Sequence, residues 1–187
     1  MKKKIISFLI AVSALLGLAL LNGQTSEAAT TENNNDPVIF VPGAFDNETS
    51  WKEMIAQLDP NNEHPVTKFS ADIDGQILRQ DVRSGNSNER PFVVVLFPQN
   101  SYTEKVISKD ADALRDALLT YNQKNPFKQA DIVGHSNGGT ITTTYLEKNA
   151  SKSGFSFHFN HFISIGTPYN FQAVNGADNT AFLNRLI

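Results

Sequence analysis

The stretch "GHSNGG" (residues 134–139) places a serine between glycines. The apolar residues of "ADIVGHS" before it indicate a strand, and "NGGTITTTYLEKNA" after it indicates a helix. In a tight turn from a strand into a helix, the positions two before and two after the serine are crowded, and Gly134 and Gly138 suit them. The spacing predicts that Ser136 is a catalytic nucleophile. An ordinary glycine-rich turn without chemistry is the alternative.

A nucleophilic serine also needs hydrogen-bond donors that stabilise the oxyanion formed when it attacks a carbonyl. The backbone N–H of Asn137 would lie at the N-terminus of the predicted helix, where the helix dipole favours negative charge. A second donor should come from the loop after an earlier strand. The loop "PGAF" (residues 42–45) follows the strand-like "VIFV", so the N–H of Ala44 is the expected donor, with Phe45 as the alternative. A plain Pro-Gly turn explains the same loop without chemistry.

The serine requires a base, and the base requires an acid that orients it. The chain has four histidines. His158 and His161 alternate with phenylalanines in "FHFNHF", which predicts solvent-facing positions on a strand. His64 is expected in an exposed loop, and His135 is expected to pack or hydrogen-bond locally. We therefore predict structural roles for all four.

In α/β proteins with this kind of serine turn, the acid and then the histidine follow the serine along the chain. Asp178 is the only acidic side chain after Glu147, and no histidine follows it. We therefore expect the catalytic Asp and His to lie beyond Ile187. On this interpretation, the 187 residues hold the N-terminal two-thirds of a hydrolase domain.

Strand and helix signals alternate along the rest of the sequence. Unbroken apolar runs at residues 38–41 and 92–97 indicate strands buried on both faces, and "FNHFISIGTP" indicates another strand. Asp74-Gly75 lies between two strand-like halves and predicts a hairpin turn. Apolar residues recur at helical spacing over 103–125. The alternation predicts an α/β fold with a parallel sheet and right-handed crossovers.

One further helix is predicted from a capping signal. Ser50 has the position of an N-cap, because Glu53 follows three residues later. The helix it begins would end before Pro60. Its buried face would carry Trp51, Met54, Ile55 and Leu58.

The first 28 residues have the order of a secretory signal peptide. Lys2–Lys4 precede an uncharged apolar run over residues 5–21, and small residues crowd the region around Ala28. Cleavage there is the expected outcome, and an uncleaved N-terminal anchor is the alternative. Residues 29–37 then form a polar linker, and residues 38–187 form the folded domain.

Composition limits the classes of function. The chain carries 16 basic and 19 acidic side chains, and loss of the signal peptide would make its net charge of −3 two units more negative. No basic stripe is present, so nucleic-acid binding is not expected. The absence of cysteine leaves an exported fold without disulfides. No metal or cofactor is expected, because Asp72, Asp74 and Asp81 lack calcium-loop spacing and no histidine pair has zinc spacing.

The serine turn, the "VPGAF" loop and the downstream "IGTPYN" together resemble the α/β-hydrolase superfamily. More narrowly, the order of signal peptide, oxyanion loop, "xDG" hairpin, buried strand and elbow is similar to the secreted or cell-surface hydrolases of Gram-positive bacteria grouped as domain-of-unknown-function family 915. The similarity runs from Val38 to Asn170. It implies an α/β-hydrolase fold, with a mostly parallel sheet, helices on both faces and C-terminal strands missing from this chain.

Two positions depart from the wider superfamily. Pro42 stands where many relatives have histidine, which leaves the backbone donors available. Asn137 stands where methionine or glutamine is common, a change that should affect the shape of the pocket more than the chemistry.

The resemblance implies a secreted, esterase- or lipase-like serine hydrolase that acts on a small-molecule or lipid ester. Association with the cell envelope is left open. Asn100 and Tyr102 are candidates for the pocket lining, although a simple turn explains them equally well. A non-catalytic exported binding module and an inactive truncated relic are the alternatives.

Overall fold

The computed structural model describes residues 35–44, 46–97, 103–149 and 157–169. The predicted signal peptide, most of the predicted linker, Phe45, Asn100, Tyr102 and Asp178 lie outside these residues. The described part contains six strands: β1 (Val38–Val41), β2 (Val66–Ala71), β3 (Ile77–Arg83), β4 (Phe92–Leu96), β5 (Gln129–His135) and β6 (His158–Ile165). It contains three helices: α2 (Glu48–Leu58), α3 (Glu104–Lys124) and α4 (Asn137–Asn149).

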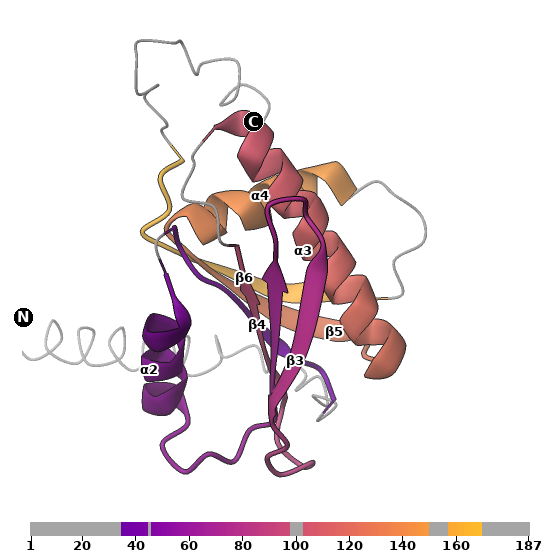
Figure 1. Cartoon of the computed structure of the whole chain (residues 1–187). Helices are drawn as coiled ribbons and strands as arrows, with labels where there is room; N and C mark the ends of the chain where they lie inside the picture. Colours follow the sequence, from indigo (N-terminus) through magenta and orange to yellow (C-terminus); the bar gives the residue numbers. More distant parts are fainter. Residues whose placement is uncertain (1–34, 45, 98–102, 150–156, 170–187) are drawn as a thin grey trace, which may run out of the picture. The chain divides into compact units, whose positions relative to one another are not determined.

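The six strands form one sheet in the order β3-β2-β4-β1-β5-β6. All neighbouring pairs are parallel except β2 and β3, which form the hairpin predicted around Asp74-Gly75. The expected α/β fold with a mostly parallel sheet is therefore confirmed (Figure 1). Because β1 lies between β4 and β5, the loop after β1 and the turn after β5 leave the sheet side by side.

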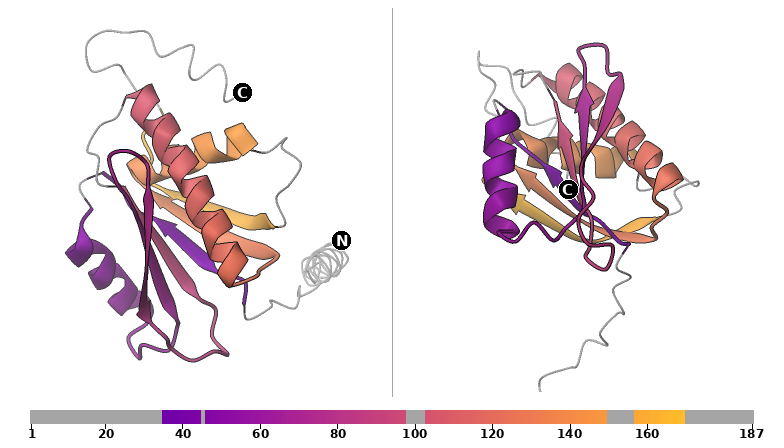
Figure 2. Two further views of the ribbon diagram at one scale, coloured as in Figure 1. Left: turned by 45° about the vertical axis from the view of Figure 1, so that its right-hand side comes forward. Right: turned by 60° about the horizontal axis from the view of Figure 1, so that its bottom comes forward.

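Helices cover both faces of this sheet. Trp51 and Ile55 of α2 pack with Phe40 and Val94 on one face. On the other face, α3 and α4 pack over strand residues that include Ile39. Figure 2 shows α2 on one side of the sheet and α3 on the other. Consecutive residues of β1 thus enter different cores, which explains the unbroken apolar run in that strand.

Helix α2 begins earlier than the sequence predicts. Asn47, and not Ser50, is the N-cap, and its side-chain oxygen accepts the backbone N–H groups of Thr49 and Ser50. The Ser50 hydroxyl in turn accepts the N–H of Asn47 at 2.8 Å, so the capping box is shifted by three residues. An asparagine caps as well as a serine, and the apolar pattern alone did not separate the two. Leu58, predicted on the buried face, is 55% exposed.

Helix α3 begins and ends where the sequence predicts. Thr103 is the N-cap, and Asn125 is the C-cap before Pro126. Its apolar face is buried against the sheet, and Ala111, Leu114 and Leu118 are fully buried. None of the described helices is long and apolar enough to cross a membrane.

Candidate active site

Ser136 occupies the turn between β5 and α4 in a backbone conformation that few L-residues adopt. Its φ is 51°, in the left-handed region, where a non-glycine residue carries strain. Its N–H donates to the carbonyl oxygen of Ile165 at the end of β6, at 2.8 Å, and its carbonyl oxygen accepts the N–H of Gly139 at 3.0 Å. The neighbouring strand and the first turn of the helix therefore hold the strained residue in place.

The glycines around this turn allow the end of β1, the serine turn and the residues after β6 to approach one another closely. A Cβ atom on Gly138 would lie 1.9 Å from the carbonyl oxygen of Val41, at the end of β1. A Cβ atom on Gly134 would lie 2.6 Å from the Cα of Gly139. Gly139 in turn packs against Thr167, whose Oγ1 would be 1.9 Å from an added Cβ. Side chains at these positions would separate the serine turn from β1 and from the end of β6.

The loop after β1 lies directly against Ser136. A Cβ atom on Gly43 would be 2.9 Å from the Cβ of Ser136 and 3.2 Å from Nδ1 of His135. The N–H of Gly43 donates to Oδ2 of Asp46 at 2.5 Å. Within the part of the chain that the structure describes, the N–H of Ala44 makes no hydrogen bond. The structure thus brings the loop that contains Ala44, one of the two predicted oxyanion donors, to the predicted nucleophile.

Asn137, the other predicted donor, is the first residue of α4, so its N–H is one of the helix N–H groups without an intrahelical acceptor. Its side chain is only 2% exposed. The Oδ1 atom of Asn137 and the Oγ1 atom of Thr140, one turn later, are buried and make no hydrogen bond within the described residues. Unsatisfied buried polar groups are uncommon in folded proteins, and here two of them adjoin the strained serine.

Three of the four histidines lie away from Ser136, two of them near the amino ends of the parallel strands and His161 in the middle of β6. His158 begins β6, and its N–H donates to the carbonyl oxygen of Lys128. His64 stacks on Phe92 at the start of β4, with ring centroids 4.2 Å apart. This residue was predicted in an exposed loop. The loop position is confirmed, but the residue is half-buried and not exposed.

The third of these histidines, His161, forms a pair with an aspartate. The pair resembles the base and acid of a catalytic site, but it is remote from Ser136. Its Nδ1 lies 2.8 Å from Oδ1 of Asp131. Asp131 precedes Ser136 by five residues on an extended strand, and at ~3.3 Å per residue the two are about 16 Å apart. The pair therefore cannot activate Ser136.

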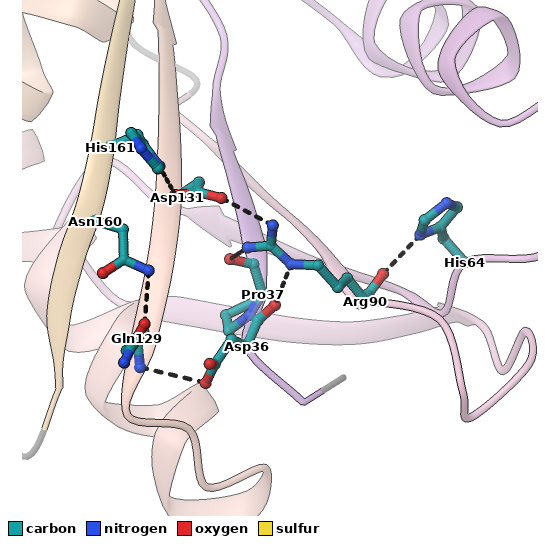
Figure 3. A network of polar contacts seen from close by, with 8 residues as sticks. All are labelled: Asp36, Pro37, His64, Arg90, Gln129, Asp131, Asn160 and His161. Atoms are coloured by element: carbon teal, nitrogen blue, oxygen red, sulfur yellow. Dashed lines mark hydrogen bonds and ion pairs between the residues drawn. The ribbon is translucent and has the colours of Figure 1, made fainter. Parts of the chain in front are cut away.

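The partners of Asp131 explain why this pair exists (Figure 3). Arg90 places a guanidinium nitrogen 2.8 Å from the second carboxylate oxygen of Asp131 and also donates to the carbonyl oxygens of Asp36 and Pro37. Burial raises the pKa of Asp131, but the hydrogen bonds from His161 and Arg90 outweigh it and hold that pKa below its ordinary value. Asp36 and Pro37, predicted as the end of a linker, are buried in this network.

A buried carboxyl group in α3 has a raised pKa, in contrast to that of Asp131. Asp110 is 3% exposed, and its Oδ2 makes no hydrogen bond within the described residues. Burial raises its pKa to about 6, although Lys109 acts in the other direction. Lys109 contacts the carbonyl oxygen of Ile73 in the β2–β3 turn, which places this part of α3 at the same edge of the sheet as Ser136.

Sequence reasoning missed two residues at this edge. Asp46 carried only a weak signal, because aspartates in turns usually accept backbone N–H groups two residues later, whereas Asp46 accepts the N–H of Gly43, three residues earlier. Asp110 carried none, since an aspartate in an amphipathic helix is usually on the solvated face. Among the described residues, no group of acidic and histidine side chains is arranged to hold a metal ion.

A family model matches residues 25–186, a range that includes every residue of this site. The family is described as alpha/beta hydrolase of unknown function (DUF915). The chain belongs to this alpha/beta hydrolase family. The resemblance stated from the serine turn and the two loops is therefore confirmed, as is the α/β-hydrolase fold. No curated protein matches the chain.

Two solved structures are similar to this alpha/beta hydrolase. One is the crystal structure of a protein from Lactobacillus plantarum WCFS1 proposed to be a cell surface hydrolase, with 29% identity and a TM-score of 0.68. The other is the product of the gene lin2722 from Listeria innocua, with 26% identity and a TM-score of 0.61. The matches cover 82% and 75% of this chain, but only 61% and 54% of the two solved chains. The chain thus spans little more than half the length of these relatives.

Proposed function

We propose that the protein is a serine hydrolase that cleaves ester bonds through an acyl-enzyme, with Ser136 as the nucleophile. The observation that carries the proposal is the strained backbone of Ser136, with a φ of 51°, packed against the Gly43 loop with no room for a side chain between them. A structural turn does not require a strained serine in this position, because glycine would make the same turn at lower cost. The strain supports a role for the hydroxyl.

The proposed reaction follows from the groups that meet at this edge of the sheet. The Oγ atom of Ser136 attacks the ester carbonyl carbon while a base accepts its proton. The N–H groups of Ala44 and Asn137 donate to the oxyanion, and removal of one such donor typically costs about 3 to 4 kcal/mol of transition-state stabilisation. The alcohol leaves with a proton, and water then attacks the acyl-enzyme and releases the acid.

We assign the base and its acid to segments outside the described residues. The positions of His64, His158 and His161 away from Ser136 support this assignment. His135 is next to Ser136 in the chain, but its ring contacts Asp46 in the loop after β1.

We further propose that the protein is exported through its N-terminal signal peptide and acts at the cell surface or outside the cell. The lysine-rich, apolar N-terminal sequence supports export, and the similar Lactobacillus protein is described as a proposed cell surface hydrolase. The substrate is a small-molecule or lipid ester, and an excess of acidic side chains is consistent with a partner that is not nucleic acid.

Hydrolysis of p-nitrophenyl esters by the protein produced from its complete gene tests this function, because the proposed acid and base lie outside the described residues. We expect Ser136→Ala to lower the rate by about 10⁴- to 10⁶-fold, as removal of a nucleophile does in other serine hydrolases. Ser70→Ala in β2 is the matched control and should retain the wild-type rate. A comparison of acetate with decanoate esters separates small from lipid substrates. An unchanged rate in Ser136→Ala would contradict the proposal.

A further inference from the structure

The loop between β1 and α2 is closed on itself by two hydrogen bonds between the same two residues. The N–H of Asp46 donates to the carbonyl oxygen of Gly43 at 3.3 Å, which has the spacing of a four-residue turn. In the reverse direction, the N–H of Gly43 donates to the Asp46 carboxylate at 2.5 Å. A hydrogen bond to an ionised carboxylate is stronger than one between neutral groups. Asp46 therefore fixes both ends of this turn.

The same carboxylate connects the turn to the serine. Its Oδ2 atom, which accepts the N–H of Gly43, also lies 3.5 Å from Nδ1 of His135. His135 directly precedes Ser136. Gly43 also lies so close to Ser136 and His135 that a Cβ atom on it would collide with Ser136, and a single carboxylate therefore links the loop to the turn that carries the serine.

This arrangement leaves a particular backbone group available. The N–H of Gly43 is occupied by Asp46, whereas the N–H of the next residue, Ala44, makes no hydrogen bond within the described residues. In a four-residue turn, the N–H groups of the two central residues are not used by the turn itself. The first uncommitted N–H of the loop is therefore that of Ala44.

We propose that Asp46 is a positioning residue, which holds the loop of residues 43–46 against the serine turn so that the Ala44 N–H keeps a fixed place beside Ser136. The inference rests on the proposed function, since it assigns a purpose to the fixed loop in stabilising an oxyanion. Asp46 touches neither substrate nor reacting atoms in this role. It acts through the backbone of Gly43, because preorganised donors stabilise developing charge more than donors that must move into place.

Two substitutions at position 46 separate this role from a general effect on folding. Asp46→Ala removes the acceptor, whereas Asp46→Asn retains an oxygen that can accept the N–H of Gly43. Asp72→Ala is the matched control. Asp72 closes the turn between β2 and β3 in a similar way, because its carboxylate accepts the N–H groups of Asp74 and Gln76.

The first measurement is amide hydrogen exchange of Gly43 in the full chain, followed by NMR. Loss of a hydrogen bond to a charged acceptor should raise the exchange rate in Asp46→Ala by about tenfold or more. Asp46→Asn should stay within about threefold of the wild type, and Asp72→Ala should match it. Unchanged exchange in Asp46→Ala would overturn the proposal, whether or not the protein is an enzyme.

The second measurement is the rate at which a fluorophosphonate probe labels Ser136 in the same variants. We expect a fall of about 10- to 100-fold in Asp46→Ala and near-complete rescue in Asp46→Asn. Faster exchange at Gly43 combined with unchanged labelling would also overturn the proposal, because the loop would then be loosened without consequence. If the wild type itself is not labelled, the proposed function fails, and the exchange result alone decides whether Asp46 holds the loop.

Discussion

The polar residues at the two ends of strand β5 differ in how they are hydrogen-bonded. At the amino end, Asp131 is paired through both carboxylate oxygens, with His161 on one side and Arg90 on the other (Figure 3). At the carboxyl end, Ser136 is strained, and the adjacent Asn137 buries a side-chain oxygen that makes no hydrogen bond within the described residues.

Two carboxyl groups with little exposed surface show the same contrast. Asp59 and Asp110 are each 3% exposed. Burial raises the pKa of both. At the amino edge of the sheet, the backbone N–H groups of Glu63 and His64 and the charge of Arg83 outweigh burial and lower the pKa of Asp59 below its ordinary value. At the carboxyl edge, nothing outweighs burial, and the pKa of Asp110 rises to about 6.

This difference distinguishes the part of the protein that stabilises the fold from the part that we propose performs chemistry. Paired polar groups stabilise a structure, whereas strain and unpaired buried groups cost stability and persist mainly at functional sites. The paired groups near the amino ends of the strands thus stabilise the fold there. The strained serine and the unpaired oxygens of Asn137 and Asp110 lie at the carboxyl edge, although Asn149, at the other end of α4, also buries an oxygen that makes no hydrogen bond within the described residues. Substitutions at each edge should therefore have different consequences.

The largest effect is expected from Gly138→Ala. An added Cβ would lie 1.9 Å from the backbone oxygen of Val41, so β1 and α4 must separate. We expect the free energy of unfolding to fall by about 4 kcal/mol or more, and labelling of Ser136 to be lost, because the collision is with backbone and cannot be relieved by a side-chain rotation. Gly166→Ala is the control: its φ is 57°, but nothing lies within 4 Å, and urea titration should show a loss of only about 1 kcal/mol.

Next in size is the effect of pH on Asp110→Asn. The folded carboxyl group holds its proton more tightly than the unfolded one, so wild-type stability falls as the pH rises from about 4 to 6. Asparagine is neutral at every pH. The variant should therefore be more stable than the wild type by about 3 kcal/mol at pH 8 and equal to it near pH 3.5.

Asp59→Asn is the matched control for this prediction, because the sign reverses. The lowered pKa of Asp59 contributes stability above its ordinary pKa, and this contribution is lost as the pH falls through the folded value. The variant should be less stable than the wild type at pH 8, and the gap should close in acid. Parallel pH profiles for the two variants would contradict the contrast between the two edges.

Arg90→Ala should lower the stability of the fold without changing the reactivity of Ser136. The substitution removes the cation from Asp131, which is 16% exposed, and two donors from backbone carbonyl oxygens. We expect a loss of about 2 kcal/mol in urea unfolding. In conditions where the variant is folded, the rate of Ser136 labelling should equal that of the wild type. Reduced labelling in fully folded protein would show that the two edges are coupled.

The smallest effect is expected from His161→Ala. Its side chain is 73% exposed, so its pair with Asp131 is weakened by solvent and should contribute less than about 1 kcal/mol. Ester hydrolysis should be unchanged, because His161 pairs with Asp131, five residues before Ser136 along β5. Loss of activity in a stable His161→Ala variant would mean that this histidine serves as the base, against the present account.

The sequence predicted the fold well where local patterns decide it. Unbroken apolar runs gave the central strands, and the spacing of Ala111, Leu114 and Leu118 gave α3. The cap of α2 was misplaced because Asn47 and Ser50 are both good capping residues, and the choice depends on where the chain leaves β1.

The sequence predicted only those features of the site that follow from local backbone conformation. The glycines around Ser136 indicated a tight turn, and the structure confirms a strained one. The contact of Gly43 with Ser136, the link made by Asp46 and the isolation of Asp110 depend on residues that are distant in sequence. No local pattern records such contacts. The roles of Ala44 and Asn137 as oxyanion donors stay predictions.

Reaction of the protein produced from its complete gene with a fluorophosphonate, followed by mass spectrometry of the labelled peptide, is the most direct test of Ser136 as an activated nucleophile. We expect one covalent adduct per molecule, on Ser136, and none in Ser136→Ala. An adduct on another serine, or a folded wild-type protein that is not labelled, would contradict the claim that the strained turn after β5 carries an activated nucleophile.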